Sequence, residues 1–193
     1  MTKEAGSERA AQTKQIIKEA FIELYRVKAI NNISVKELTN RAGFNRGTFY
    51  IYYQDIYGLL GEIEEEILQE LHKIGNKIKG YDISSFNPDE PLPALLEILK
   101  YLKSRNRYIE ALLGENGDPS FSVKFKDLMK QYLFAKIKIE NKEYGQYSEY
   151  LLEYMASAYI GTFIYWVQKG MEIAPEELAL FLGKIVFKGP VNI

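Results

Sequence analysis

Apolar side chains recur along most of the chain at intervals of three and four residues, the spacing of one face of an α-helix. The segment 16–25 carries such a stripe, and a second stripe runs from Leu60 to Ile78. No segment shows the alternation of a β-strand bounded by turn residues. The pattern therefore predicts an all-α protein with about nine helices. The expected helices cover residues 8–27, 35–42, 46–52, 55–79, 92–104, 107–113, 119–139, 147–169 and 175–187.

Proline separates the later helices, since it is poorly tolerated in helix interiors. All six prolines lie at or after Pro88. The stretch 80–93, which contains three of them, is the expected seam between two halves of the chain. The segment 147–169 is apolar and aromatic on nearly all sides, which indicates a buried helix.

A short segment near the N-terminus carries the most specific pattern. Ser34 and Glu37 have the spacing of a capping box at a helix start. Gly43 suits the left-handed backbone of a tight turn, and Asn45 can cap a second helix. Two short helices joined by such a turn fit a helix-turn-helix, whose second helix lies in the DNA major groove. The same spacing also fits a plain helical hairpin in a bundle.

Charge is unevenly distributed along the chain. The formal net charge of −1 argues by itself against a nucleic-acid-binding protein. Residues 1–53, however, hold nine Lys or Arg and five Asp or Glu, a net +4, whereas residues 54–193 hold sixteen and twenty-one, a net −5. This asymmetry fits a polyanion-binding domain at 1–53 and an acidic domain at 54–193, although counts this small also arise by chance.

Residues 9–60 resemble the N-terminal domain of TetR-family transcriptional regulators. The matching elements are the helix at 16–25, the strings 33–38, 42–44 and 47–50, and the pairs 52–53 and 59–60. The resemblance implies an N-terminal three-helix DNA-binding domain with a helix-turn-helix, followed by a helical-bundle domain for effector binding and dimerisation. The string 113–121 resembles a C-terminal domain type found among these regulators in Firmicutes.

The resemblance also implies roles in DNA binding. Ser34, Thr48 and Tyr52 match phosphate-contacting positions, and Arg46 is the expected guanine contact because a bidentate arginine–guanine pair discriminates by about 1–3 kcal/mol. The full set of expected DNA contacts is Ser34, Lys36, Asn45, Arg46, Gly47, Thr48, Tyr50, Ile51 and Tyr52. One position departs from the family. The lysine that commonly opens the fourth helix is Ile56 here, so one phosphate contact is expected to be missing.

An unknown small-molecule effector is expected in the second domain. Aromatic residues make up 13% of the chain. A pocket lined by apolar side chains with a few hydroxyl groups suits a flat or hydrophobic ligand. The candidates are Tyr101, Tyr108, Phe121, Phe125, Tyr132, Tyr154, Tyr159, Phe163 and Trp166. Most aromatic side chains of such a bundle belong to its core, which is the alternative for each of these residues.

The last two helices are the expected dimer interface. Small residues such as Ala158 and Gly161 allow a second helix to approach closely. The full set of candidates is Ala158, Gly161, Thr162, Tyr165, Leu178, Phe181, Leu182 and Ile185. The alternative is that these stripes close the core of one chain. A dimer is favoured because a helix-turn-helix protein reads two half-sites about 34–36 Å apart.

Several other functions lack the residues they need. With no cysteine and one histidine, His72, neither a metal site nor a cofactor is expected. No nucleophile elbow, phosphate-binding loop or dinucleotide fingerprint points to an enzyme. No signal peptide or membrane span is recognisable, so we expect a cytoplasmic protein without a membrane partner.

The sequence thus predicts a homodimeric, ligand-responsive repressor. It is expected to bind a palindromic operator in double-stranded DNA and to release it when a small molecule binds the second domain. A helical protein–protein adaptor is the rival hypothesis, since an adaptor does not need the face from Arg46 to Tyr52 to be open, and burial of that face in the dimer would favour it.

Overall fold

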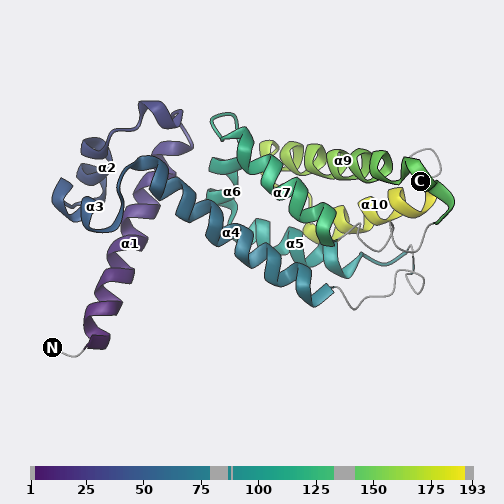
Figure 1. Cartoon of the computed structure of the whole chain (residues 1–193), viewed down its shortest axis with the longest axis horizontal. Helices are drawn as coiled ribbons and strands as arrows, with labels where there is room; N and C mark the ends of the chain where they lie inside the picture. The colour runs from purple at the N-terminus through teal and green to yellow at the C-terminus, as the bar shows by residue number, and fades with distance from the viewer. Residues whose placement is uncertain (1–2, 79–86, 88, 133–141, 190–193) are drawn as a thin grey trace.

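The computed structural model describes residues 3–78, 87, 89–132 and 142–189. Nine α-helices and two 3-10 helices lie within these residues and no strand does, so the predicted all-α fold is confirmed (Figure 1). The elements are α1 (Lys3–Tyr25), η1 (Ile30–Asn32), α2 (Val35–Ala42), α3 (Arg46–Tyr52), α4 (Ile56–Ile78), α5 (Pro93–Ser104), α6 (Asn106–Leu113), α7 (Pro119–Tyr132), η3 (Lys142–Tyr147), α9 (Ser148–Gln168) and α10 (Pro175–Lys188). None of the described helices is long and apolar enough to cross a membrane.

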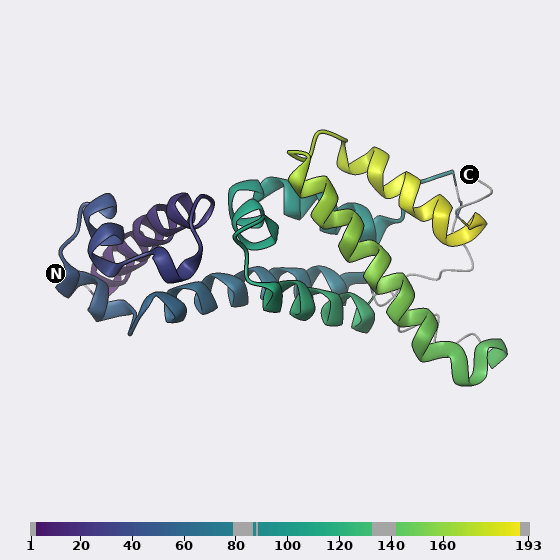
Figure 2. The same ribbon diagram turned by 90° about the horizontal axis from the view of Figure 1, so that it is seen from above.

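The helices form two parts that α4 connects. Helices α1 to α3 make a small unit at one end of the molecule, and α5 to α10 make a larger bundle at the other (Figure 1). Within the bundle, α7 packs against α4 and α9, and α5 packs against α4 and α10. The first turns of α9, together with η3, extend beyond the bundle (Figure 2).

Most helix boundaries agree with the predicted ones. Helices α2 and α3 cover the predicted residues 35–42 and 46–52. Helix α1 begins at Lys3, earlier than predicted, and the 3-10 helices were not predicted. The expected helix 119–139 is observed as far as Tyr132, and its remainder lies outside the described residues, as does most of the expected seam 80–93.

One continuous hydrophobic core joins the two parts. On α1, Ile17, Phe21 and Tyr25 are fully buried. Helix α4 contributes buried residues along its length, from Ile56 to Ile74. Because α4 belongs to the core of both parts, the division of the chain at residue 53 stays a prediction.

The reversal between α9 and α10 is fixed by backbone geometry. Gly170 and Met171 both adopt left-handed conformations, with φ values of 67° and 54°. The Met171 side chain is buried, and its N–H donates to the Trp166 carbonyl over 2.9 Å. The Trp166 indole N–H in turn donates to the Ile173 carbonyl over 2.9 Å. These contacts define how α10 leaves α9.

Candidate nucleic-acid interface

The first helix of the helix-turn-helix is α2, which begins and ends at the predicted residues. The Ser34 hydroxyl accepts a hydrogen bond from the Glu37 N–H over 3.1 Å. The other half of the expected capping box is not formed, because the Glu37 carboxylate pairs with Lys28 instead. Gly43 ends the helix with a φ of 74°, a left-handed conformation that favours glycine.

The second helix, α3, is held by one buried face and a capped start. The Asn45 side chain accepts hydrogen bonds from the Thr48 N–H over 2.8 Å and from the Thr48 hydroxyl over 3.2 Å. The Phe49 ring is fully buried and lies 5.6 Å from the ring of Tyr53. The Tyr53 hydroxyl donates to Glu62 of α4 over 3.1 Å, which ties α3 to the helix that leads into the bundle.

The opposite face of α3 is open. The expected DNA contacts Ser34, Lys36, Asn45, Arg46, Gly47, Tyr50 and Ile51 are exposed, and Thr48 and Tyr52 are half-buried. Ile51 is 74% exposed, which is unusual for an aliphatic side chain but suits contact with a thymine methyl group. No described part of the chain covers this face, so the burial that would favour the adaptor hypothesis is not found within one chain.

The basic side chains among the expected DNA contacts form no ion pairs with other described residues. Lys14, Lys18, Arg26, Lys28 and Arg41 each form an ion pair with a glutamate. Arg9, Lys36 and Arg46 form no ion pair with any described residue. Among the described cations of residues 9–53, two of the three without an ion pair, Lys36 and Arg46, are therefore expected DNA contacts.

The start of α4 lacks the basic residue that family members commonly have there. Ile56 is buried, with 6% of its surface exposed, so its side chain belongs to the core. The N-terminal turn is capped by Asp55, whose carboxylate accepts from the Gly58 N–H over 2.8 Å. The expected absence of a phosphate contact at position 56 stays a prediction.

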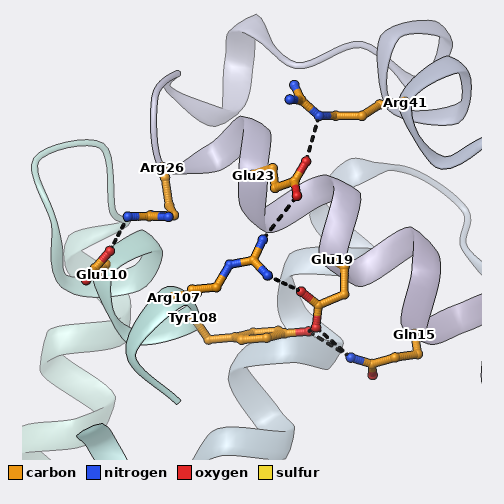
Figure 3. Close-up of polar contacts among 8 residues, drawn as sticks. All are labelled: Gln15, Glu19, Glu23, Arg26, Arg41, Arg107, Tyr108 and Glu110. Atoms are coloured by element: carbon orange, nitrogen blue, oxygen red, sulfur yellow. Dashed lines mark hydrogen bonds and ion pairs between the residues drawn. The ribbon is translucent and has the colours of Figure 1, made fainter. Parts of the chain in front are cut away.

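A polar junction connects the unit formed by α1 to α3 to the bundle (Figure 3). The Arg107 guanidinium of α6 lies 3.2 Å from a Glu19 carboxylate oxygen and 3.1 Å from one of Glu23. The other Glu23 oxygen accepts from Nε of Arg41 on α2 over 2.8 Å. The Arg41 hydrogen bond is the main cause that holds the pKa of Glu23 below its usual value. Glu23 therefore bridges the bundle and the helix-turn-helix.

Tyr108, an expected effector contact, belongs to this junction. Its hydroxyl donates to Glu19 over 2.7 Å and accepts from the Gln15 side chain over 3.1 Å. Burial, together with the bond to the Glu19 carboxylate, raises the pKa of the tyrosine. The sequence contains no signal for these contacts, because the partners lie more than 80 residues apart in the chain.

The remaining effector candidates divide into core and surface residues. Phe121, Phe125 and Phe163 are fully buried and form a row with ring centroids 6.3 and 6.0 Å apart. Tyr159 lies edge-on to Phe163. Trp166 and Tyr132 are buried and Tyr101 is half-buried. Tyr154 is 67% exposed, and its assignment to an internal ligand site is corrected, since its position on α9 directs it to solvent.

The expected dimer residues also divide into two groups. Ala158, Gly161, Tyr165 and Phe181 are exposed, and Thr162 and Ile185 are half-buried. Leu178 and Leu182 are 4% and 5% exposed. For these two residues the expectation is corrected, because they already pack within the core of one chain. Tyr154 lies one helical turn before Ala158 and extends the exposed face of α9.

An exposed second helix in a helix-turn-helix, carried on a helical bundle, is the architecture of a DNA-binding transcriptional regulator. A TetR-type family model described as a transcriptional regulator C-terminal region matches residues 89–188, which is more than half of the chain. The chain belongs to the TetR family of transcriptional regulators. This membership confirms the predicted family and the prediction that the chain is not an enzyme.

Two curated relatives match most of the chain. The uncharacterized HTH-type regulator YxbF of Bacillus subtilis is 23% identical over 177 residues, which are 88% of this chain and 43% of YxbF. The present chain thus spans less than half the length of that relative. The dhaKLM operon transcriptional activator DhaS of Lactococcus lactis is 25% identical over 149 residues, covering 76% of this chain and 74% of DhaS.

Solved structures share the fold. A TetR transcriptional regulator from Streptococcus agalactiae superposes with a TM-score of 0.69 and 22% identity, covering 96% of this chain and 99% of that one. NalD, the secondary repressor of the MexAB-OprM multidrug efflux pump in Pseudomonas aeruginosa, gives 0.68 and 20%, covering 94% and 97%.

Proposed function

We propose that the chain is a homodimeric, ligand-responsive repressor of the cytoplasm that binds a palindromic operator. The observation that carries the proposal is the open face of α3. Arg46 and Ile51 lie exposed there, while Phe49 anchors the opposite side of the helix. A short, firmly held helix with free arginine and apolar groups is suited to reading base edges in the major groove.

In this proposal, few cationic side chains contact the phosphates of the DNA backbone. Lys36 and Arg46 are uncommitted, whereas the other described cations of α2 and its flanking loops are paired with glutamates. Exposed hydroxyl and backbone donors near Ser34 and Gly47 add neutral contacts to the DNA backbone. Since few counterions are released, binding should depend less steeply on salt than in regulators with more phosphate-binding cations.

The proposed dimer forms through the exposed faces of α9 and α10. Tyr154, Ala158, Gly161 and Tyr165 follow one another along α9 at helical spacing, and Phe181 of α10 is 48% exposed. Nothing lies within 4 Å of the place a Cβ would take at Gly161, which leaves room for a partner helix. Two-fold pairing of these faces supplies the two reading heads that a palindrome requires.

The proposed effector binds among the aromatic rings of the bundle. The row formed by Phe121, Phe125 and Phe163 joins α7 to α9, and the Tyr159 ring lies edge-on to Phe163. An apolar, flat molecule that separates these rings would change the packing of α7 against α9. Such a ligand binds more tightly to the dimer conformation that leaves room for it, whereas the operator binds more tightly to a conformation with another arrangement of the two DNA-binding units.

Release of DNA, and hence repression, is the mode we propose. Relatives of both modes exist, since DhaS is named an activator and NalD a repressor. The decisive experiment combines a footprint on the DNA upstream of the chain's own gene with a reporter in a deletion strain. We expect a protected palindrome that holds two chains, and higher reporter expression after deletion. Lower expression would overturn repression, and the absence of any protected site would overturn operator binding there.

A further inference from the structure

The turn between α6 and α7 has a backbone that only glycine permits at two positions. A Cβ on Gly114 would lie 2.3 Å from the Glu110 carbonyl oxygen, and one on Gly117 would lie 2.1 Å from that of Leu112. The Gly117 N–H closes the turn by donating to the Gly114 carbonyl over 3.0 Å. The path of this turn therefore requires glycine at both positions.

The turn is hydrogen-bonded to the carboxyl end of α1 and to the residue that follows it. The Asn116 side-chain amide donates to the Arg26 carbonyl over 3.3 Å. The Asp118 N–H donates to the hydroxyl of Tyr25 over 2.9 Å, and Tyr25 is fully buried. Arg26 directly follows Tyr25, the last residue of α1, so Asn116 and Asp118 bind the chain at the point where α1 ends. An ion pair between Arg26 and Glu110 lies beside these bonds.

Helix α6 continues the contact along α1. Arg107 and Tyr108 bind Glu19 and Glu23, and Glu23 passes the contact on to Arg41 at the end of α2 (Figure 3). Both ends of α6 are thus fixed to α1, and one of the α1 carboxylates is fixed to the helix-turn-helix. All these bonds are polar, and most of their side chains are partly exposed, so they can open without exposing a large apolar surface.

We propose that the turn 114–118, together with Arg107 and Tyr108, is an interdomain latch that sets the orientation of the unit formed by α1 to α3 on the bundle. Helix α7 begins directly after the turn, so a displacement of α7 opens the bonds to Tyr25 and Arg26. The effect of the latch on DNA affinity rests on the proposed function, whereas its effect on orientation does not.

The test is an interdomain distance in the full chain. The chain has no cysteine, so Asn40→Cys on α2 and Glu172→Cys after α9 introduce two spin labels at exposed positions. Dilution with unlabelled chain isolates the distance within one protomer. The double variant Tyr25→Phe/Asn116→Ala removes two latch bonds, and Asn76→Ala/Tyr150→Phe removes the same groups from exposed positions. Circular dichroism checks folding, and Asn116→Ala alone serves if the double variant does not fold.

The latch predicts a broader or displaced distance distribution in the latch variant only. It also predicts a change in operator affinity of about five-fold or more, the lower range of allosteric coupling, although neither residue lies on the DNA-reading face. An unchanged distribution overturns the latch. A changed distribution with unchanged affinity overturns its role in regulation. If the wild-type chain binds no operator, the proposed function fails, and the distance measurement still decides whether the latch exists.

Discussion

The ring of Tyr132 on α7 lies directly against Gly75 on α4, so a Cβ at position 75 would come within 2.5 Å of the ring. The contact fixes the spacing of two neighbouring helices at the far end of the bundle. We expect Gly75→Ala to lower the free energy of unfolding by about 1–3 kcal/mol, the usual cost of overpacking a core. Urea denaturation measures this change.

The same helix provides the control for this prediction. Gly61 is exposed and has nothing within 4 Å of the place a Cβ would take. Because alanine favours a helix over glycine, Gly61→Ala should raise stability by about 0.5–1 kcal/mol. A Gly75→Ala chain as stable as Gly61→Ala would contradict the close contact between Gly75 and Tyr132.

The dimer proposal predicts that a charged side chain at Gly161 prevents association. Gly161→Glu adds no clash within the protomer, since a Cβ there meets nothing within 4 Å, but it places a carboxylate where the partner helix would pack. Gly61→Glu makes the same change on α4 and should leave the dimer intact. Sedimentation equilibrium measures the mass of each variant. If Gly161→Glu and the wild-type chain have the same dimer mass, the interface lies elsewhere.

An acid-sensitive contact holds α7 to α9. Hydrogen bonds from Lys126 and Lys130 lower the pKa of Glu153 to about 2 from an ordinary value of 4.5. A carboxylate whose pKa is lower in the folded than in the unfolded chain stabilises the fold at pH values above its unfolded pKa. This contribution is lost as the pH falls from about 4.5 toward about 2. Glu153→Gln should therefore destabilise the chain at neutral pH and lose this effect in acid.

Denaturant titrations of the wild-type chain and the variant at several pH values measure the difference. Glu172→Gln is the matched control, because Glu172 is exposed and forms no ion pair with a described residue. A difference between wild type and Glu153→Gln that stays constant below pH 4.5 would show that the ion pairs of Glu153 do not stabilise the fold.

The local parts of the candidate site could be predicted from sequence. Ser34, Gly43 and Asn45 define the ends of α2 and α3 through bonds to residues three or four positions away, and such bonds depend only on neighbouring residues. The bridge from Arg107 through Glu23 to Arg41 could not be predicted. Its charges are ordinary surface charges in the sequence, and only the docking of α6 on α1 brings them together.

The faces of α9 and α10 were only partly predictable for a related reason. An apolar stripe shows that a helix packs against something, but it does not tell a partner chain from the chain's own core. Leu178 and Phe181 lie three residues apart on α10, and the first is buried within the protomer whereas the second is exposed. Which residues of an apolar stripe are buried depends on the angle at which the neighbouring helices cross it. The spacing of apolar residues does not specify that angle directly.

The central claim, that the open face of α3 reads DNA, is tested most directly by comparing Arg46→Ala with Arg9→Ala. Both arginines lack an ion-pair partner among the described residues, but only Arg46 lies on α3. Fluorescence anisotropy measures binding to the footprinted operator and to a scrambled duplex at fixed salt. We expect Arg46→Ala to lose about 1–3 kcal/mol of preference for the operator per half-site and Arg9→Ala to keep it. An Arg46→Ala chain with the preference of the wild type would contradict the claim.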